Sequence, residues 1–199
     1  MRLNTIRLRC LLGWLGLLLP WIVTALVGYF PSSISATWFT NACTAFMIIL
    51  GSASILLICY KGYQVIDDIL LTCSGVFGLG VCLFPCYVDG APARYGTFML
   101  PGNVSDIIHT ICAALLFTLL AVNSFFLFTK TDDKNNMTNK KKIRNIIYRV
   151  CGIGMVAVYL MFLLPDFYIK VWLIETIALF FFGVSWLTKA NRYKFLFCD

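Results

Sequence analysis

Two ionisable side chains lie just inside apolar segments of this chain, each near the start of its segment. His109 is three residues into the apolar run 107–129, and Glu175 is about one turn into the run 171–188. At 1.5 Å per residue, each lies about 5–7 Å below its helix start. Asp106 precedes His109 by three residues, which places both on one helix face. An ionisable residue at such depth is energetically costly and is therefore a functional-site candidate.

An acid, an imidazole and a second acid are group types used for proton transfer and for binding polar ligands. One hypothesis is that Asp106 orients the His109 ring while Glu175 accepts the other imidazole proton. The alternative is structural, with Glu175 paired to Lys170, Arg94 or His109 so that it ties helices together. The sequence leaves both open.

Further polar residues fall in loops expected at the same end. Ser33 and Ser35 lie in the first such loop and Arg94 in the second, so they join the candidate ligand-binding set. Asn123 lies fourteen residues after His109, which returns it to within about 40° of the same helix face. The residues between them are mostly apolar, so the sequence predicts no continuous water path, and Asn123 is expected to hydrogen-bond a neighbouring helix.

The composition requires an apolar environment for most of the chain. Of 199 residues, 60% are hydrophobic and only 13% charged, whereas soluble domains carry about 25% charged residues. Segments of about 20 apolar residues are long enough to cross a bilayer as helices. We therefore predict an all-α fold with residues 1–199 as a single integral membrane domain. The six expected spans are 11–30, 41–60, 69–88, 107–129, 147–164 and 171–188.

The positive charges are distributed very unevenly between the expected loops. Two of the 16 Lys and Arg residues, Arg94 and Lys170, fall on one side, and the rest fall on the other, including those of a basic loop at 130–146. Basic loops mark the cytoplasmic side, and six spans place both termini there. We predict a multi-pass protein of the cell membrane with both ends cytoplasmic. The net charge of +7 then reflects topology, and no nucleic-acid partner is expected.

The nine cysteines do not suggest a disulfide framework or a metal site. Most lie in apolar runs, where Cys behaves as a small packing residue, and a zinc site needs ligands that one histidine does not supply. No metal and no cofactor is predicted. In the third expected span, Ser74, Gly78, Cys82 and Cys86 recur every four residues. Such a small-residue stripe predicts close approach of a neighbouring helix.

Several short motifs resemble those of an uncharacterised family of small bacterial polytopic membrane proteins with six spans. The motifs are Ser33-Ile-Ser-Ala-Thr37, Tyr60-Lys-Gly-Tyr63 with Asp67-Asp68, Leu83-Phe-Pro-Cys86, Ile108-His109, Glu175 and Ser185-Trp-Leu187. That resemblance implies an inner-membrane location in bacteria and no established activity. A weaker likeness is to ceramidase and progestin-receptor-type membrane hydrolases, which hold zinc with several His on seven spans. One histidine and six expected spans depart from that pattern.

These observations favour a binding or transport protein with an outward-facing polar pocket for a small polar or lipid-like ligand. Two alternatives stay open. One is a membrane hydrolase or transferase that uses His109 and an acid on a lipid, so the sequence does not decide whether the protein is an enzyme. The other is an oligomeric pore or scaffold subunit held by the small-residue stripe. The expected partners are membrane lipids and, in the last case, further copies of this chain.

Overall fold

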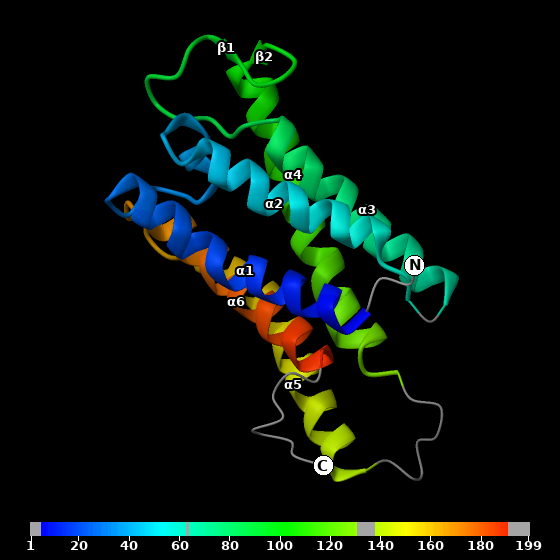
Figure 1. Cartoon of the computed structure of the whole chain (residues 1–199). Helices are drawn as coiled ribbons and strands as arrows, with labels where there is room; N and C mark the ends of the chain where they lie inside the picture. Colours follow the sequence, from blue (N-terminus) through cyan, green and yellow to red (C-terminus); the bar gives the residue numbers. More distant parts are fainter. Residues whose placement is uncertain (1–4, 63, 131–137, 191–199) are drawn as a thin grey trace.

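A computed structural model describes residues 5–62, 64–130 and 138–190, and its architecture is helical (Figure 1). The α-helices are α1 Thr5–Val27, α2 Cys43–Cys59, α3 Val65–Leu83, α4 Gly102–Val122, α5 Asn139–Ala157 and α6 Lys170–Lys189. The 3-10 segments are η1 Ser35–Phe39 and η3 Val158–Leu163, and the π segment is η2 Asn123–Leu127. Two short strands, β1 Arg94–Tyr95 and β2 Leu100–Pro101, form an antiparallel pair. The predicted all-α class is confirmed.

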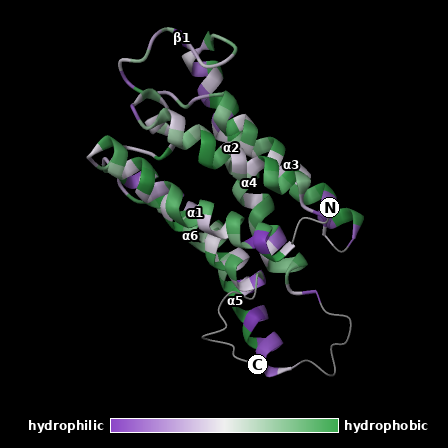
Figure 2. Cartoon of the chain, viewed as in Figure 1, coloured by the Kyte–Doolittle hydropathy of each residue, from purple (hydrophilic) through white to green (hydrophobic). Residues whose placement is uncertain are grey.

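Five of these helices are long and apolar enough to cross a membrane. They are α1, α3, α4 with η2, α5 with η3, and α6, whereas α2 is apolar but has 17 residues. Hydrophobic residues colour most of the bundle, and a hydrophilic stretch marks the start of α5 (Figure 2). Apolar helices of this length suggest a membrane-embedded protein.

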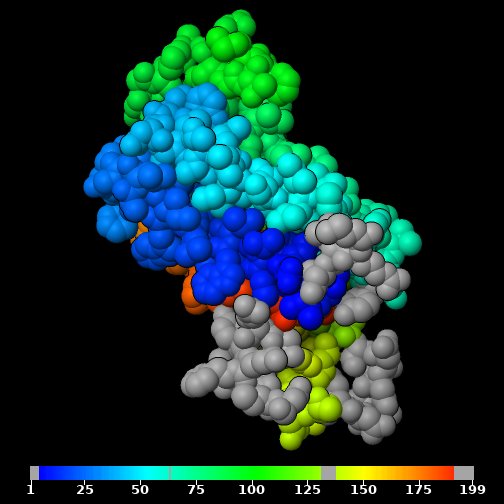
Figure 3. Space-filling view, in the orientation of Figure 1, coloured from blue at the N-terminus to red at the C-terminus, as the bar shows by residue number. Residues whose placement is uncertain are grey.

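The helices form a closed ring in which each packs on its neighbours in sequence. α1 packs on α2, α2 on α3, α3 on α4, α4 on α5 and α5 on α6, and α6 closes the ring against α1. In the space-filling view, α1 and α2 lie against each other over much of the visible face (Figure 3). One buried cluster, which includes Leu12, Phe46, Met155 and Trp186, runs through the middle of the ring. The chain therefore forms one bundle.

Glycines bring two helix pairs into close contact. A Cβ on Gly78 of α3 would lie 2.3 Å from the Ser54 hydroxyl of α2, and one on Gly75 would lie 2.4 Å from the Ser54 carbonyl oxygen. A Cβ on Gly183 of α6 would lie 2.8 Å from Gly13 O of α1. The predicted close approach at Gly78 is confirmed. The predicted stripe stops at Cys82, however, because α3 ends at Leu83 and Cys86 lies beyond the helix.

Helix boundaries differ from prediction where a local signal overrides hydrophobicity. α3 ends before 88 because Pro85 restricts Phe84, which adopts an extended conformation with φ −115° and ψ 91°. α5 begins at Asn139, not 147, because the Thr138 hydroxyl accepts a hydrogen bond from Lys141 N and caps the helix. Lys140, Lys141 and Lys142 are therefore helical rather than part of a loop at 130–146, of which residues 131–137 lie outside the described residues.

The alternating helix directions gather the connections at two ends of the bundle. We call the end with residues 28–42, 84–101 and 164–169 the hairpin end, because β1 and β2 lie there (Figure 1). The opposite end, with residues 60–62, 128–130 and 189–190, is the basic end. Trp172 N bonds Ser32 O at the hairpin end, and Arg9 Nε bonds the Tyr60 hydroxyl at the basic end. The predicted site residues fall mainly at the hairpin end.

Candidate functional site

The first two turns of α4 hold the backbone that follows α3. Three side chains share this task, since each hydrogen-bonds one backbone group of residues 84–87. The pairs are Ser105 Oγ to Pro85 O at 2.7 Å, Tyr87 N to Asp106 Oδ1 at 2.8 Å and His109 Nδ1 to Phe84 O at 2.7 Å. Because a carbonyl oxygen only accepts, Nδ1 of His109 carries a proton. Asp106 thus bonds the loop backbone and does not orient the imidazole as predicted.

Glu175 plays the same part for the loop that precedes η1. Its carboxylate accepts hydrogen bonds from Ile34 N and from Ser35 Oγ, the latter at 2.9 Å. The Ser33 hydroxyl accepts from Ala36 N at 2.9 Å, which closes the first turn of η1. The hypothesis that Glu175 takes a proton from His109 is therefore not what the structure shows.

The predicted pairing of Glu175 with a cation is not seen either. Lys170, five residues earlier on α6, directs Nζ to Asp166 Oδ1 at 2.9 Å and to Leu164 O at 2.6 Å. Arg94 is exposed in β1 and reaches Met99 O at 3.5 Å. Glu175 thus ties α6 to a loop and not to a charged side chain.

Between these clamped loops lies a cavity of about 490 Å³. It is bounded by α4, η3 and α6, with the loops at the hairpin end above it. Five of the predicted site residues line it: Ser33, Ser35, Asp106, His109 and Glu175. The sequence therefore identified a set of residues that the fold brings together around one hollow.

Two predicted site residues do not belong to this cavity. Arg94 is not among its lining residues. Asn123 lies in η2, close to the basic end, is 1% exposed and lines a separate void of about 10 Å³. Its Nδ2 atom has no hydrogen-bond partner within the described residues. The predicted hydrogen bond from Asn123 to a neighbouring helix is therefore not made by Nδ2 to any part of the chain that the structure describes, and Asn123 lies in a different cavity from His109.

The cavity is polar at one side and apolar through the rest. The apolar walls were missed by sequence reasoning, because Phe and Tyr in an apolar run also fit simple core packing. The walls are formed by Ala113, Ala114, Phe117, Tyr159, Phe162, Val171, Ile174 and Ala178. Tyr159 donates a hydrogen bond to Ala114 O at 3.3 Å, so it bridges η3 and α4 across this wall. The lining is amphipathic.

Exposure of the lining residues separates a mouth from a floor. Tyr168, Tyr87 and Phe162 are 68%, 57% and 53% exposed, whereas Ile174 is 4% and Ala178 is 1% exposed. Aromatic rings therefore surround the opening, and small aliphatic groups form the deepest part. A second cavity of about 420 Å³ adjoins the first, and Ser32 and Tyr168 line both.

The electrostatic character of the two cavities is acidic. Their lining includes Asp106 and Glu175 in the first and Asp89 in the second, with no Lys or Arg in either lining. Burial, together with the nearby Glu175 and Asp106 charges, raises the pKa of the Cys86 thiol to about 12, and a Ser33 hydrogen bond opposes this shift. Cys86 is therefore a neutral thiol at physiological pH and not a nucleophile.

Metal ligation is not supported by the arrangement of these groups. Within residues 5–62, 64–130 and 138–190, no three His, Cys, Asp or Glu side chains gather closely enough to hold an ion. Asp106, His109 and Glu175 at the hairpin end instead form hydrogen bonds with loop backbone atoms. The arrangement can position a ligand's polar group beside two carboxylates.

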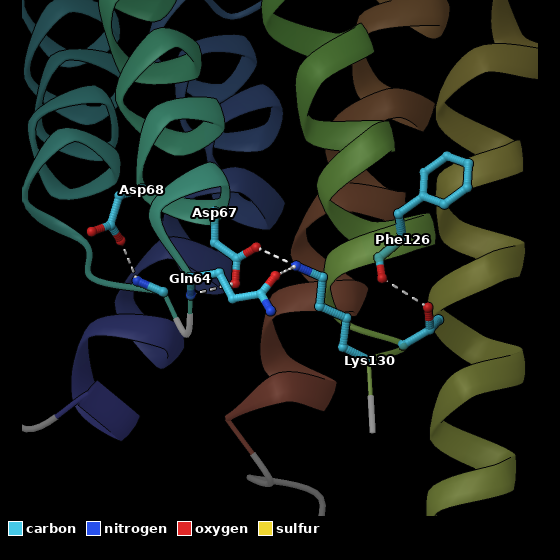
Figure 4. A network of polar contacts seen from close by, with 7 residues as sticks. Gln64, Asp67, Asp68, Phe126 and Lys130 are labelled. Carbon is cyan, nitrogen blue, oxygen red and sulfur yellow. Dashed lines mark hydrogen bonds and ion pairs between the residues drawn. The ribbon is translucent and has the colours of Figure 1, made fainter. Parts of the chain in front are cut away.

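A second polar centre lies at the basic end, where the Lys130 side chain reaches Asp67 and Gln64 (Figure 4). Asp67 is 3% exposed and pairs with Lys130 Nζ at 2.7 Å, and Lys130 also donates to Gln64 Oε1 at 2.7 Å. Asp67 further accepts from Gln64 N as part of a capping box, while Asp68 accepts from Gly62 N at 2.7 Å. Asp67 therefore caps the start of α3, whereas Asp68 holds the turn that precedes it.

Comparisons with known proteins add nothing to this geometry: no family model, no curated protein and no solved structure matches the chain. The family resemblance noted on the sequence motifs stays a prediction.

Proposed function

We propose that the protein is a multi-pass protein of the cell membrane with six spans, and that the hairpin end faces outward. The uneven charge supports this orientation, since the basic end carries nearly all Lys and Arg residues. The 17 residues of α2 extend about 26 Å at 1.5 Å per residue, within the range that spans a bilayer. Both termini then lie in the cytoplasm.

Single-cysteine accessibility tests this orientation. Arg94→Cys at the hairpin end should react with a membrane-impermeant maleimide in intact cells, whereas Lys61→Cys should react only after permeabilisation. Both side chains are exposed, and that of Lys61 is 82% exposed. Peptide mass spectrometry separates each new site from the native cysteines. Labelling of Lys61→Cys in intact cells would show that the basic end does not face the cytoplasm and would contradict the proposed topology.

We further propose that the cavity at the hairpin end binds one amphiphilic, lipid-like molecule. The observation that carries this function is the division of a 490 Å³ hollow into a polar side with two carboxylates and an apolar, aromatic-walled remainder. Ligand sites usually measure about 300–1,000 Å³ and combine apolar walls with a few polar groups. An apolar tail suits the Ala113–Phe117 wall, and a polar head suits the Asp106 and Glu175 side.

The same geometry favours binding over catalysis. A general acid or base must reach the reacting group within hydrogen-bond distance, yet His109, Asp106 and Glu175 already bond loop backbone. Their bonds shape the roof of the cavity. These residues support a positioning role, and the cavity that they shape supports ligand binding.

Native mass spectrometry of the protein released from membranes tests the binding function. Wild-type protein should retain one amphiphile per chain. Ala114→Trp fills the hollow, because Ala114 lines the cavity and is exposed rather than packed in the core, and this variant should lose the adduct. Ile111→Trp is the matched control, since Ile111 is 53% exposed on the same helix and outside the cavity. Equal retention by wild type and both variants would exclude the cavity as the binding site.

A further inference from the structure

The two cavities at the hairpin end have a charge opposite to that of the whole chain. The chain contains 16 Lys and Arg against 9 Asp and Glu. The cavity linings nevertheless include three acids, Asp89, Asp106 and Glu175, and no basic residue. The hairpin end itself has two basic residues, Arg94 and Lys170, and four acids, of which only Asp166 lies outside the two linings.

Of the two basic residues at the hairpin end, Lys170 adjoins a lining residue in sequence, and its charge is paired with an acid. Lys170 precedes the lining residue Val171, but its Nζ donates to Phe162 O at 3.2 Å and Leu164 O at 2.6 Å. The Asp166 carboxylate lies 2.9 Å from the same Nζ. The positive charge of Lys170 is therefore compensated by Asp166, and neither residue lines the cavity.

The carboxylates keep capacity for a ligand after they have bonded the loops. An ionised carboxylate offers about four acceptor positions. Asp106 accepts one hydrogen bond, from Tyr87 N, and Glu175 accepts from Ile34 N and Ser35 Oγ. Unused lone pairs on both groups can accept from an N–H donor in the hollow. A phosphate or carboxylate head would instead meet acids of like charge and would find no Lys or Arg in the lining.

The aromatic mouth suits the same kind of ligand. Tyr87, Phe162 and Tyr168 line the opening and are the most exposed large side chains there. Aromatic faces attract ammonium groups, and they also contact an apolar chain. Tyr168 lies on the boundary with the second cavity, where Asp89 adds a further negative charge. A cationic group moving from the loops into the cavity would meet acids and aromatic rings throughout.

We infer that the ligand is a cationic amphiphile: an apolar chain with an ammonium head, held between Asp106 and Glu175 with its chain along the Ala113–Phe117 wall. This inference rests on the proposed binding function and specifies the chemistry of its head group. The protein thereby selects among amphiphiles by charge, and the apolar wall supplies affinity common to all of them.

A comparison of three probes with one chain length tests the head-group preference. The full-length protein is placed in phosphatidylcholine nanodiscs at neutral pH, and retention of radiolabelled dodecylamine, dodecanol and dodecanoate is measured against empty nanodiscs. An alkyl ammonium titrates near 10.4, as lysine does, so the amine is protonated. We expect the amine to bind about tenfold more tightly than the alcohol, the effect of one hydrogen bond to a charged group. Dodecanoate should bind most weakly.

Two variants connect the preference to the cavity. Glu175→Gln keeps the side-chain shape and should remove most of the difference between amine and alcohol. Thr110→Lys places a cation in the lining, because Thr110 faces the cavity and is exposed, and should reverse the order to favour dodecanoate. Thr110→Met is the uncharged control of similar length and should leave the order unchanged. Comparison of Thr110→Lys with Thr110→Met tests the head-group preference even if Glu175→Gln does not fold.

The outcomes separate this inference from the function on which it rests. Amine preference in wild type, with reversal in Thr110→Lys alone, supports the cationic head. Equal binding of the three probes, all lost in Ala114→Trp, would overturn the head-group inference and leave the binding function standing. Retention no greater than in empty nanodiscs would overturn both.

Discussion

At the basic end of the bundle, the buried Asp67 carboxylate pairs with the Lys130 ammonium, whereas at the hairpin end Asp106 and Glu175 bond loop residues beside a cavity. Asp67 and Lys130 form a direct ion pair, and aromatic rings fill the space beside them, with Trp186 centred 5.2 Å from both Tyr60 and Phe128. At the hairpin end, Asp106 and Glu175 each hold a separate loop. Acidic residues thus lie beside packed aromatic rings at the basic end and beside a cavity at the hairpin end.

The difference indicates what each end contributes. At the basic end, the Asp67–Lys130 pair joins the start of α3 to the segment after η2, and the void beside it measures about 10 Å³. At the hairpin end, Asp106 and Glu175 bond loop residues, and the cavity beside them measures about 490 Å³. We therefore assign stability chiefly to the basic end and ligand binding to the hairpin end, and three substitutions test that assignment.

The largest effect is expected for Asp67→Ala at the basic end. Removing the acid breaks the 2.7 Å bond to the partly exposed Lys130 ammonium and the capping bond from Gln64 N, and the two losses together cost about 3 kcal/mol. Chemical denaturation in detergent measures this loss in the free energy of unfolding. Lys61→Ala is the control, because its pair with Asp68 is solvent-exposed and contributes little. Equal effects of the two variants would contradict the assignment.

Gly78→Leu should have an intermediate effect, in the packed region between the two ends. A side chain there would overlap Ser54 of α2, and overpacking costs about 1–3 kcal/mol. The thermal midpoint in detergent should fall. Gly51→Leu on α2 provides the comparison, since a Cβ at Gly51 meets nothing within 4 Å. A fall of the same size in both variants would show that close contact at Gly78 is not the cause.

The smallest stability effect is expected for Ser105→Ala at the hairpin end. The Ser105 hydroxyl is fully buried and bonds Pro85 O, so its removal leaves that carbonyl without its donor, at a cost of about 1 kcal/mol. Retention of the amphiphile should weaken more clearly than stability, because the loop roofs the cavity. Ser74→Ala is the control, since Ser74 is equally buried but bonds Leu70 O of its own helix. Loss of stability without loss of retention would remove residues 84–87 from the site.

Hydrophobic runs were sufficient to predict the helical class and the approximate place of every α-helix. The predicted boundaries were wrong where a single residue ends or starts the helix. Pro85 ends α3 earlier than its apolar run predicts, and Thr138 caps α5 earlier than its apolar run begins. The other end of this helical segment, after η3 at Leu163, lies within one residue of the expected end at 164.

The candidate site was predictable as a set of residues but not as a set of contacts. Ser33, Ser35, Asp106, His109 and Glu175 stand out because polar groups in apolar segments are conspicuous, and the structure gathers them. Their partners are backbone atoms such as Phe84 O and Ile34 N. Every residue carries the same backbone groups, so no pattern of side chains indicates which will be bonded. The hollow itself depends on how packed side chains leave space, which a linear sequence does not specify.

The central claim is that the hollow at the hairpin end holds an amphiphile, and direct observation tests it best. Electron cryomicroscopy of wild-type protein in nanodiscs, with an antibody fragment bound for alignment, should show an elongated density from the Phe117 wall to the Glu175 carboxylate. The same density should be absent from Ala114→Trp. An empty or collapsed cavity in wild type, in a map that resolves lipid chains on the outer surface of the bundle, would contradict the account.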